Sequence, residues 1–323
     1  MSDEASTKGQ KKIAMAMADP DGNVFATGLR ELKSKSAANT LEVFLQILED
    51  IDRRHDQTGS LIGKRILAAI RHTMSDRAAC EKKFNELVAD LVSKVIPQIE
   101  ESAGLLDEED ARPIIRLKHF FCSLHNLVHM ADVAAAQALA AEKLHFDGKS
   151  PANGFTKPGE SGGVRAVRTS CKAFAPGADD KNGCYGKLSV FLQPILKSKY
   201  GVNAIPITPF YGHRFNVLFY NSAAIYCLIP SLLEFLSTNP LNGLTASVYH
   251  DLQNFQYVAQ IRSFAIMDKL YMGPFQRLIE DRKVGIFEMG QFYRLLIQGL
   301  EDAAQKPNVL LEGVYQQKCF SAA

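Results

Sequence analysis

The stretch Ile66-Leu-Ala-Ala-Ile70, which leads to Thr73-Met-Ser-Asp76, decides how we interpret the fold of this chain. The apolar run predicts a buried strand over residues 65–74, and this strand delivers Asp76 at its carboxyl end. A segment with helical periodicity follows, and further along comes Phe120-Phe-Cys122-Ser-Leu-His125. The order is therefore a strand with an acidic residue at its end, then a helix, then a Cys-x-x-His segment. The flanking segments fit the same scheme.

Upstream of this strand the sequence predicts a hairpin and a helix. Asp19-Pro-Asp-Gly22 lies between two short apolar runs, residues 13–17 and 24–28, and Asp-Gly in that setting is a hairpin signal. Apolar residues then recur at helical spacing from Leu41 to Ile51. Residues 1–11 are small, polar and charged, so we expect a disordered tail there.

Downstream, the character of the chain changes near residues 147–163, which are rich in Gly, Pro, Ser and Asn and indicate a linker loop. Before it, the pattern of residues 117–124 fits a strand or a helix, and that of residues 128–144 fits a helix. After it, residues 164–323 carry almost only helical patterns. We therefore predict an α/β fold, with a mixed core at residues 12–146 and a large all-α addition.

Composition limits the classes of function. Of 323 residues, 46% are hydrophobic and 22% charged, which is typical of a globular protein with a real core. Lys and Arg number 37 against 35 Asp and Glu, a net charge of +2. A free-standing DNA-binding protein usually has a more basic surface, so the overall charge argues mildly against one.

The amino terminus and the cysteines indicate a compartment. Met1-Ser-Asp-Glu4 contains no apolar signal region, and the six cysteines are scattered. We therefore expect a reducing environment, nuclear or cytoplasmic, rather than secretion. The longest apolar run, residues 217–236, is interrupted by Asn221, Pro230 and Glu234, so we expect no membrane partner. We also expect no nucleotide cofactor, because Gly59-Ser-Leu-Ile-Gly63 lacks the spacing of a phosphate-binding loop.

Asp76 has two interpretations. A carboxylate at the end of a core strand can point into a site that binds divalent metal ions, as phosphoryl transfer requires. Alternatively, Asp76 caps the helix that follows, because Asp and Ser are good residues at that position. Both interpretations can hold at once.

Cys122 and His125 form half of a zinc-ligand pattern, and Cys171 and Cys184 could complete it. The second pair is too widely spaced for a compact zinc motif, so we do not expect a structural zinc ion. The alternative is that Cys122 is a small apolar residue and His125 a hydrogen-bonded histidine of the core.

The segment Phe210-Tyr-Gly-His213-Arg214-Phe-Asn216 mixes aromatic and basic residues. His213 and Arg214 could contact phosphate, and the aromatic rings could stack on bases. The alternative is a turn that begins a helix, in which Arg214 pairs with a carboxylate.

Four phrases together carry a resemblance. They are Thr73-Met-Ser-Asp-Arg-Ala-Ala-Cys-Glu-Lys-Lys-Phe-Asn-Glu-Leu87, Phe120-Phe-Cys-Ser-Leu-His-Asn-Leu-Val128, Phe210-Tyr-Gly-His-Arg-Phe-Asn-Val-Leu-Phe-Tyr220 and Asp268-Lys-Leu-Tyr-Met-Gly-Pro274. In this order the chain resembles animal proteins derived from DNA transposons, in particular hAT-type transposases. The resemblance extends from about Gly28 to about Leu300, and it implies a ribonuclease-H-like core with a long helical insertion.

The resemblance also implies a set of active-site residues. Such transposases use two aspartates and a glutamate to bind two Mg²⁺ or Mn²⁺ ions, and a Cys-or-Asp-x-x-His motif follows the second aspartate. Asp76 matches the second aspartate, and Cys122 with His125 matches the motif. The glutamate belongs on a helix after the insertion, where Glu234 and Asp251 are the two candidates.

The chain departs from that pattern at its amino terminus. The first aspartate belongs on a first core strand ahead of the hairpin, and Asp3 falls in the expected disordered tail. We therefore expect the first core strand and its carboxylate to be missing. We expect the zinc-finger-like segment at the amino terminus of these transposases to be missing as well, as in a truncated relative.

Two functions follow as expectations. The first is a transposase-derived protein whose ancestor cut and joined DNA, inactive in this chain because its metal site is incomplete. The alternative is a non-catalytic interaction or structural protein that uses its helical half as a platform for a protein partner. DNA is the partner in the first, and a protein in the second.

Overall fold

The computed structural model describes residues 2–7, 10–19, 21–55, 62–76, 78–103, 117–178, 183–210, 216–281, 283–285 and 288–312. The chain folds into two compact units, Met1–His125 and Asn126–Ala323. The first unit is mixed α/β and the second is helical in its described part. The α/β class predicted from the sequence is therefore confirmed at that level.

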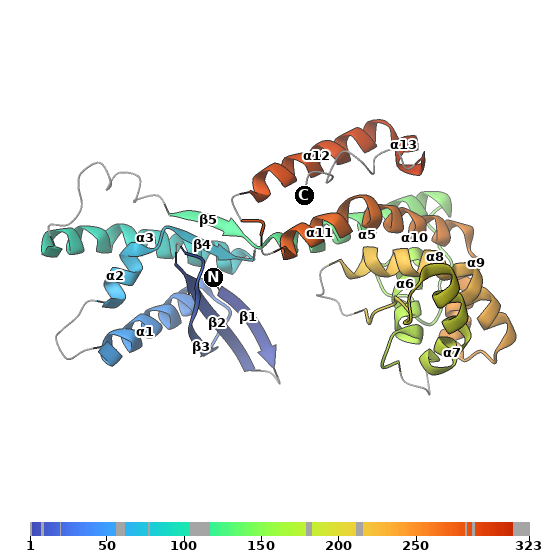
Figure 1. The fold of residues 1–323 in the computed structure, drawn as a ribbon, viewed down its shortest axis with the longest axis horizontal. Coiled ribbons are helices and arrows are strands. Elements are labelled where there is room, and N and C mark those ends of the chain that lie inside the picture. The colour runs from blue at the N-terminus through green and yellow to red at the C-terminus, as the bar shows by residue number, and fades with distance from the viewer. Residues whose placement is uncertain are drawn as a thin grey trace. The chain divides into compact units, whose positions relative to one another are not determined.

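Three antiparallel strands open the first unit, in the order β1-β2-β3: β1 is Ser2–Thr7, β2 Gln10–Ala18 and β3 Val24–Leu32 (Figure 1). The predicted hairpin is confirmed, because Ala18 pairs with Val24 around the Asp-Gly turn. The expectation of a disordered tail was wrong, since β1 pairs with β2 from Ser2 opposite Met15 to Thr7 opposite Gln10.

Helix α1 (Ala37–His55) covers this sheet with the apolar face that its periodicity predicted. Phe44, Ile47 and Leu48 are buried on α1, together with Ile13 of β2 and Leu32 of β3. Because these residues lie in one cluster, the hairpin and α1 share a core, which burial of apolar surface stabilises.

The predicted strand over residues 65–74 forms part of a helix and a strand instead of one strand. Residues Ile62–Ala69 are helix α2, and only His72–Ser75 are a strand, β4. The prediction of a strand over residues 65–74 was therefore wrong in its first half. Gly63 and Leu67 are buried one helical turn apart on α2, which places them on the same face of the helix.

The next helix and strand complete the first unit. Helix α3 (Ala79–Ala103) buries Phe84, Val88 and Val92 in the same core. Strand β5 (Lys118–Phe121) then pairs with β4 in parallel, from His72 opposite Lys118 to Ser75 opposite Phe121. A strand in residues 117–124 is thus confirmed, but it ends at Phe121, because helix α5 (Ser123–His145) begins two residues later.

The second unit is a bundle of helices, as the periodic apolar faces predicted. After α5 come α6 Gly162–Phe174, α7 Tyr185–Ile195, the π-helix η1 Leu196–Tyr200, α8 Val217–Thr238, α9 Gly243–Gln253, α10 Phe255–Met267, the π-helix η2 Asp268–Met272, α11 Gly273–Glu280, α12 Met289–Gln305 and α13 Pro307–Glu312. Over its described ranges this unit contains no strand.

Residues 147–163 differ from the expected linker between domains. The division of the chain lies at His125 and Asn126, and this loop belongs to the helical unit. Side chains of α6 hold it there: Arg165 donates to the carbonyl of Pro151, and Arg168 donates to that of Phe155. A Gly- and Pro-rich composition signals a loop, but it does not tell a linker from a loop packed against its own domain.

Helix α8 is the central helix of this unit. By length and composition it qualifies as a membrane span, and half of that apolar window is buried inside the protein. It packs against α10, where the rings of Phe219 and Phe264 meet edge to face, and Asn221 is fully buried. The amide of Asn221 accepts from the Thr208 N–H and donates to the Val217 carbonyl, so its polar atoms are satisfied within the unit.

Candidate carboxylate site

The end of β4 is fixed by a buried polar contact from α3. Asn85 donates to the Ser75 hydroxyl at 3.1 Å, and both side chains are buried. The Ser75 hydroxyl in turn donates to the Asp76 carbonyl. Asp76 is half-buried, and its Oδ1 accepts the Ala78 N–H at 2.8 Å just before α3 begins. Asp76 therefore accepts the N–H of Ala78, the residue just before α3, in a turn that leads into the helix.

Strand β5 brings the Cys-x-x-His segment to the same edge. The Cys122 N–H donates to the Ser75 carbonyl at 2.9 Å, which continues the parallel ladder to the residue opposite Asp76. Nearer the start of the strands, the Thr73 hydroxyl and His119 Nδ1 lie 2.6 Å apart. Burial lowers the pKa of His119, while the charge of Glu86 opposes that shift. The backbone therefore places Asp76 and Cys122 side by side.

Strand β1 contains Asp3, which the sequence analysis had placed in a disordered tail. Part of β1 approaches β4, although the two strands belong to different sheets, and Asp3 occupies the position opposite Ala14 of β2 (Figure 1). Only the backbone of Ser2–Thr7 is described, so Asp3 is placed by its register. The chain therefore has a strand ahead of the hairpin.

Asp251, a candidate for the third acid, is engaged in a buried ion pair. Both of its oxygens accept from Arg165, at 2.9 Å from Nε and 2.7 Å from Nη2, and the two side chains are each 4% exposed. Burial alone would lower the pKa of Arg165, but the hydrogen bond and charge of Asp251 outweigh it and the net shift is upward. The Asp251 carboxylate therefore serves to hold α6 against α9.

Glu234, the other candidate, is exposed on α8 in the helical unit. The hydroxyls of Ser237 and Thr238 donate to its backbone carbonyl, which closes the last turn of the helix. Cys122 and His125 belong to the first unit, whereas Cys171 and Cys184 belong to the second. Within the described residues, no group of three His, Cys, Asp or Glu side chains could hold a metal ion.

His213 and Arg214 lie outside the described residues. Shortly after them, Asn216 adopts a left-handed backbone (φ 60°), and its amide donates to the Asp268 carboxylate at 3.1 Å. Both residues are buried, and burial raises the pKa of Asp268. Sequence reasoning missed this pair, although Asp268 opens one of the four phrases of the resemblance. The available signal was an acidic residue in the segment 264–272, where Lys269 is the only other charged residue.

The buried Asp268 predicts a pH-dependent stability. A carboxyl group whose pKa is raised on folding stabilises the fold in its protonated form, so its contribution is lost as pH rises through the folded pKa. The Asp268→Asn variant keeps an acceptor for Asn216 and removes the charge. We expect it to melt above the parent chain at neutral pH, with the difference shrinking as pH falls. Thermal melts across this range test it, and a constant difference would contradict the assignment.

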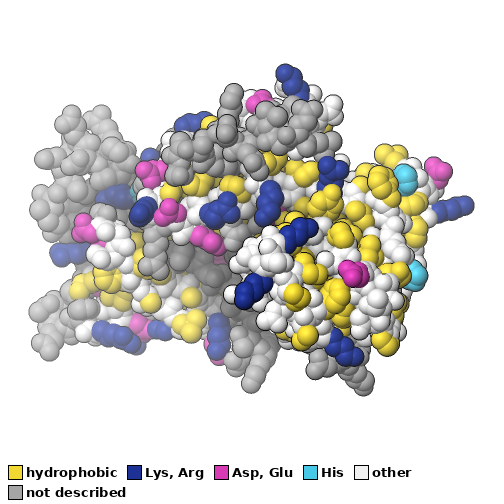
Figure 2. Space-filling model, turned by 45° about the vertical axis from the view of Figure 1, so that its right-hand side comes forward, with side chains coloured by type: hydrophobic (Ala, Val, Ile, Leu, Met, Phe, Trp, Pro, Cys, Tyr) yellow, Lys and Arg dark blue, Asp and Glu magenta, His cyan; other side chains and the backbone are white. Residues whose placement is uncertain are grey.

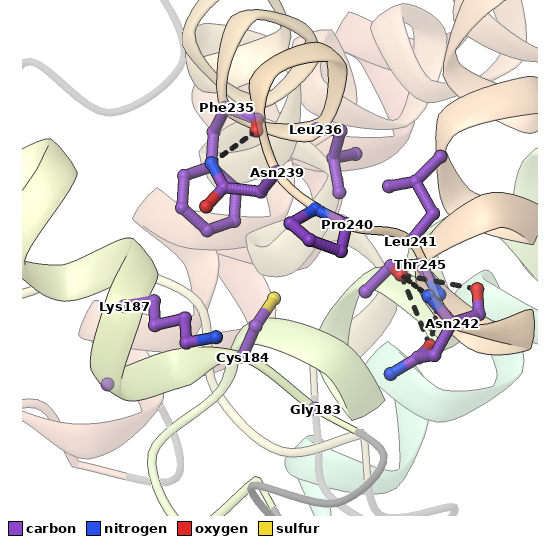
Figure 3. A pocket seen from close by; sticks show the side chains of 11 residues that line it. Gly183, Cys184, Lys187, Phe235, Leu236, Asn239, Pro240, Leu241, Asn242 and Thr245 are labelled. Carbon is purple, nitrogen blue, oxygen red and sulfur yellow. Dashed lines mark hydrogen bonds between the residues drawn. The ribbon is translucent and has the colours of Figure 1, made fainter.

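A cavity of about 460 Å³ lies between α7 and the α8–α9 turn of the helical unit. Figure 3 shows the Cys184 thiol pointing into it toward Pro240, with Lys187 beside it. Burial raises the pKa of Cys184 to about 11, although Lys187 opposes the shift. The thiol is therefore protonated at neutral pH, where a nucleophile would need to be a thiolate.

Comparisons with protein-family models, with curated proteins and with solved structures find no match to this chain.

Proposed function

We propose that this chain is a transposase-derived protein whose first unit is a ribonuclease-H-like core and whose ancestor cut and joined DNA. The observation that carries the proposal is the approach of β1 to β4. A strand that contains an aspartate, Asp3, thus comes near the strand that ends at Ser75, just before Asp76, and β5 then leads into Cys122. This is the order in which the resemblance implies the first aspartate, the second aspartate and the Cys-x-x-His motif.

Asp3 and Asp76 are the residues that would hold a divalent ion. Carboxylate oxygens are the ligands that Mg²⁺ and Mn²⁺ prefer, and among the described residues the Asp76 carboxylate is engaged only through its Oδ1, which accepts the Ala78 N–H. Such an ion, when bound, stabilises charge on a phosphoryl oxygen. Two hydrogen bonds fix the position of Asp76. Asn85 donates to the Ser75 hydroxyl, and this hydroxyl donates to the Asp76 carbonyl.

We also propose that cleavage activity has been lost. The Arg165 guanidinium neutralises Asp251, and releasing that carboxylate for a metal ion would leave a buried cation unpaired. Two carboxylates suffice for one weakly held ion, whereas phosphoryl transfer with two ions needs a third acidic ligand to balance the charge.

A cleavage assay tests this loss. We expect no Mg²⁺- or Mn²⁺-dependent cleavage or strand transfer on DNA ends by the parent chain or by Asp76→Asn. We expect Asp76→Asn to change the unfolding free energy by less than about 0.5 kcal/mol, because asparagine keeps an acceptor for the Ala78 N–H. Asp90→Asn, at an exposed position of α3, is the matched control. Metal-dependent nicking that disappears in Asp76→Asn but persists in Asp90→Asn would overturn the proposed loss.

The alternative function, a platform for a protein partner, is favoured by apolar side chains on the surface of the helical unit. Phe255 is 81% exposed at the start of α10, and Leu295 and Ile297 are exposed on α12. Figure 2 shows hydrophobic side chains among Lys and Arg side chains on one face of the described surface. Exposed apolar residues of this size often mark interaction sites when they are contiguous.

A further inference from the structure

The sequence between Asp180 and Glu234 contains no acidic residue. Acidic residues occupy 35 of the 323 positions of the chain, so a stretch of this length would ordinarily carry several. The same stretch holds five basic residues, which are Lys181, Lys187, Lys197, Lys199 and Arg214. The near-neutral charge of the whole chain therefore conceals a strongly basic segment.

The structure places three of these lysines on the surface of α7 and η1. Lys187, Lys197 and Lys199 are exposed, whereas Leu188, Leu192 and Leu196 are buried against the rest of the unit. Lys187 and Lys197 are ten residues apart in the sequence, or nearly three helical turns, and both side chains are exposed. Among the described residues, none of the three lysines forms an ion pair.

The π-helical turn η1 makes the end of this face protrude. Pro194 lies inside α7 and lacks the N–H of a regular helix, and the wider turn follows it. Residues 197–200 are consequently exposed in succession, until Gly201 ends the helix with a φ of 67°. The Lys199 ammonium lies 5.3 Å from the Tyr200 ring centroid, and the Tyr200 hydroxyl donates to the Cys227 carbonyl of α8. A fixed, 40% exposed aromatic ring thus stands beside the lysines.

We propose that this surface, defined by Lys187, Lys197, Lys199 and Tyr200 and called the α7–η1 face, binds the phosphate backbone of DNA. The proposal rests on the proposed function only for the class of partner. At a rise of about 1.5 Å per residue, Lys187 and Lys197 are roughly 15 Å apart along the helix. That distance spans about four nucleotides of one strand at about 3.4 Å per step. The charge, its spacing and the adjacent ring suit a backbone contact with stacking, without base specificity.

An anionic membrane surface is the main competing partner for basic residues on a helix. Membrane-surface helices bury an apolar face in the lipid. The apolar face of α7 is already used inside the protein, because Leu188 and Leu192 are fully buried and Phe191 packs on Phe235 of α8. The outward face offers lysines with Val190 between them, which suits a polyanion rather than a hydrocarbon boundary.

The test measures the salt dependence of DNA binding by the full chain and a triple variant, Lys187→Gln, Lys197→Gln and Lys199→Gln. The control triple variant is Lys157→Gln, Lys283→Gln and Lys306→Gln, at exposed positions of the same unit with the same change of charge. A short duplex and its single strand serve as probes between about 50 and 200 mM salt. Phosphatidylserine vesicles serve as the membrane probe, and circular dichroism checks that both variants fold.

We expect the α7–η1 variant to lower the slope of log K against log salt by about 2–3 for the duplex, at about 0.9 per lost phosphate contact. We expect its affinity to fall about tenfold or more at the lower salt concentration, while the control variant retains the parent slope. Equal losses in both variants would overturn the proposal, as would a loss of vesicle binding with DNA binding intact. If the parent chain does not bind DNA, the proposal that the α7–η1 face binds DNA is wrong. That result leaves the proposed carboxylate pair untouched, because binding of Mn²⁺ by Asp3 and Asp76 is measured separately.

Discussion

The Arg165→Ala variant is expected to lose about 3–5 kcal/mol of unfolding free energy, because it leaves the Asp251 carboxylate buried without its partner. Arg165 also donates to the Pro151 carbonyl and the Thr156 hydroxyl, and its guanidinium lies 5.2 Å from the Tyr257 ring centroid. One side chain therefore joins α6, α9, α10 and the 147–163 loop. A loss of this size is a large fraction of the stability of an ordinary domain.

Urea denaturation followed by circular dichroism measures this loss, since the chain contains no tryptophan. Arg262→Ala, at an exposed position of α10, is the control, and we expect it to change stability by less than about 0.5 kcal/mol. The double variant Arg165→Met, Asp251→Leu should recover much of the loss, because an apolar pair needs no charge compensation. A cost below about 1 kcal/mol for Arg165→Ala would show that the ion pair does not hold this unit together.

The second large effect is expected at Gly162, the first residue of α6. A Cβ placed there would overlap the ring of Tyr257, which is fully buried and hydrogen-bonded through its hydroxyl to the Pro151 carbonyl. The backbone cannot retreat freely, because the Gly162 N–H donates to the buried Glu142 carboxylate at 2.6 Å. We expect Gly162→Ala to cost about 1–3 kcal/mol or more through overpacking, although alanine favours a helix.

Gly290→Ala is the matched control, because a Cβ at that position of α12 would meet open space. We expect it to be neutral or to stabilise the chain by up to about 1 kcal/mol. Thermal denaturation of both variants, and of Gly162→Ala combined with Tyr257→Leu, separates the clash from a backbone effect. If Gly162→Ala were as benign as Gly290→Ala, the close approach of α6 and α10 would be wrong.

Local signals predicted much of the first unit. The Asp19-Pro-Asp-Gly22 turn and the apolar face of α1 were readable because a turn and a helix are set by neighbouring residues. The helix α2 was misread, since a short apolar run such as residues 66–70 does not distinguish a strand from a helix by periodicity. Its Leu and Ala residues, which favour helices, were the overlooked signal.

Strand β1 was missed for a different reason. Ser2–Thr7 contains almost no apolar residues, so neither composition nor alternation indicates a strand. Its conformation comes from pairing with β2. Only Lys8 and Gly9 separate the paired residues Thr7 and Gln10, and a two-residue connection with glycine was a hairpin signal that could have been used.

Contacts between distant residues were beyond the sequence. Arg165 and Asp251 lie 86 positions apart, and neither stands in a pattern that would predict a partner. The ion pair that engages the Asp251 carboxylate could therefore be found only in the three-dimensional structure. The Gly162-Gly163 pair was a partial clue, because glycines inside a helix often mark a close approach by another element.

Titration of the full chain with Mn²⁺, followed by the electron paramagnetic resonance signal of the free ion, tests the central claim most directly. The account predicts one weak site that is lost in Asp3→Asn and also in Asp76→Asn, and is retained in Asp90→Asn. Loss in both variants would mean that the two neighbouring strands supply one carboxylate each to the same ion. A Mn²⁺ titration that is identical for the parent chain and the Asp3→Asn and Asp76→Asn variants would contradict the proposed ribonuclease-H-like carboxylate pair.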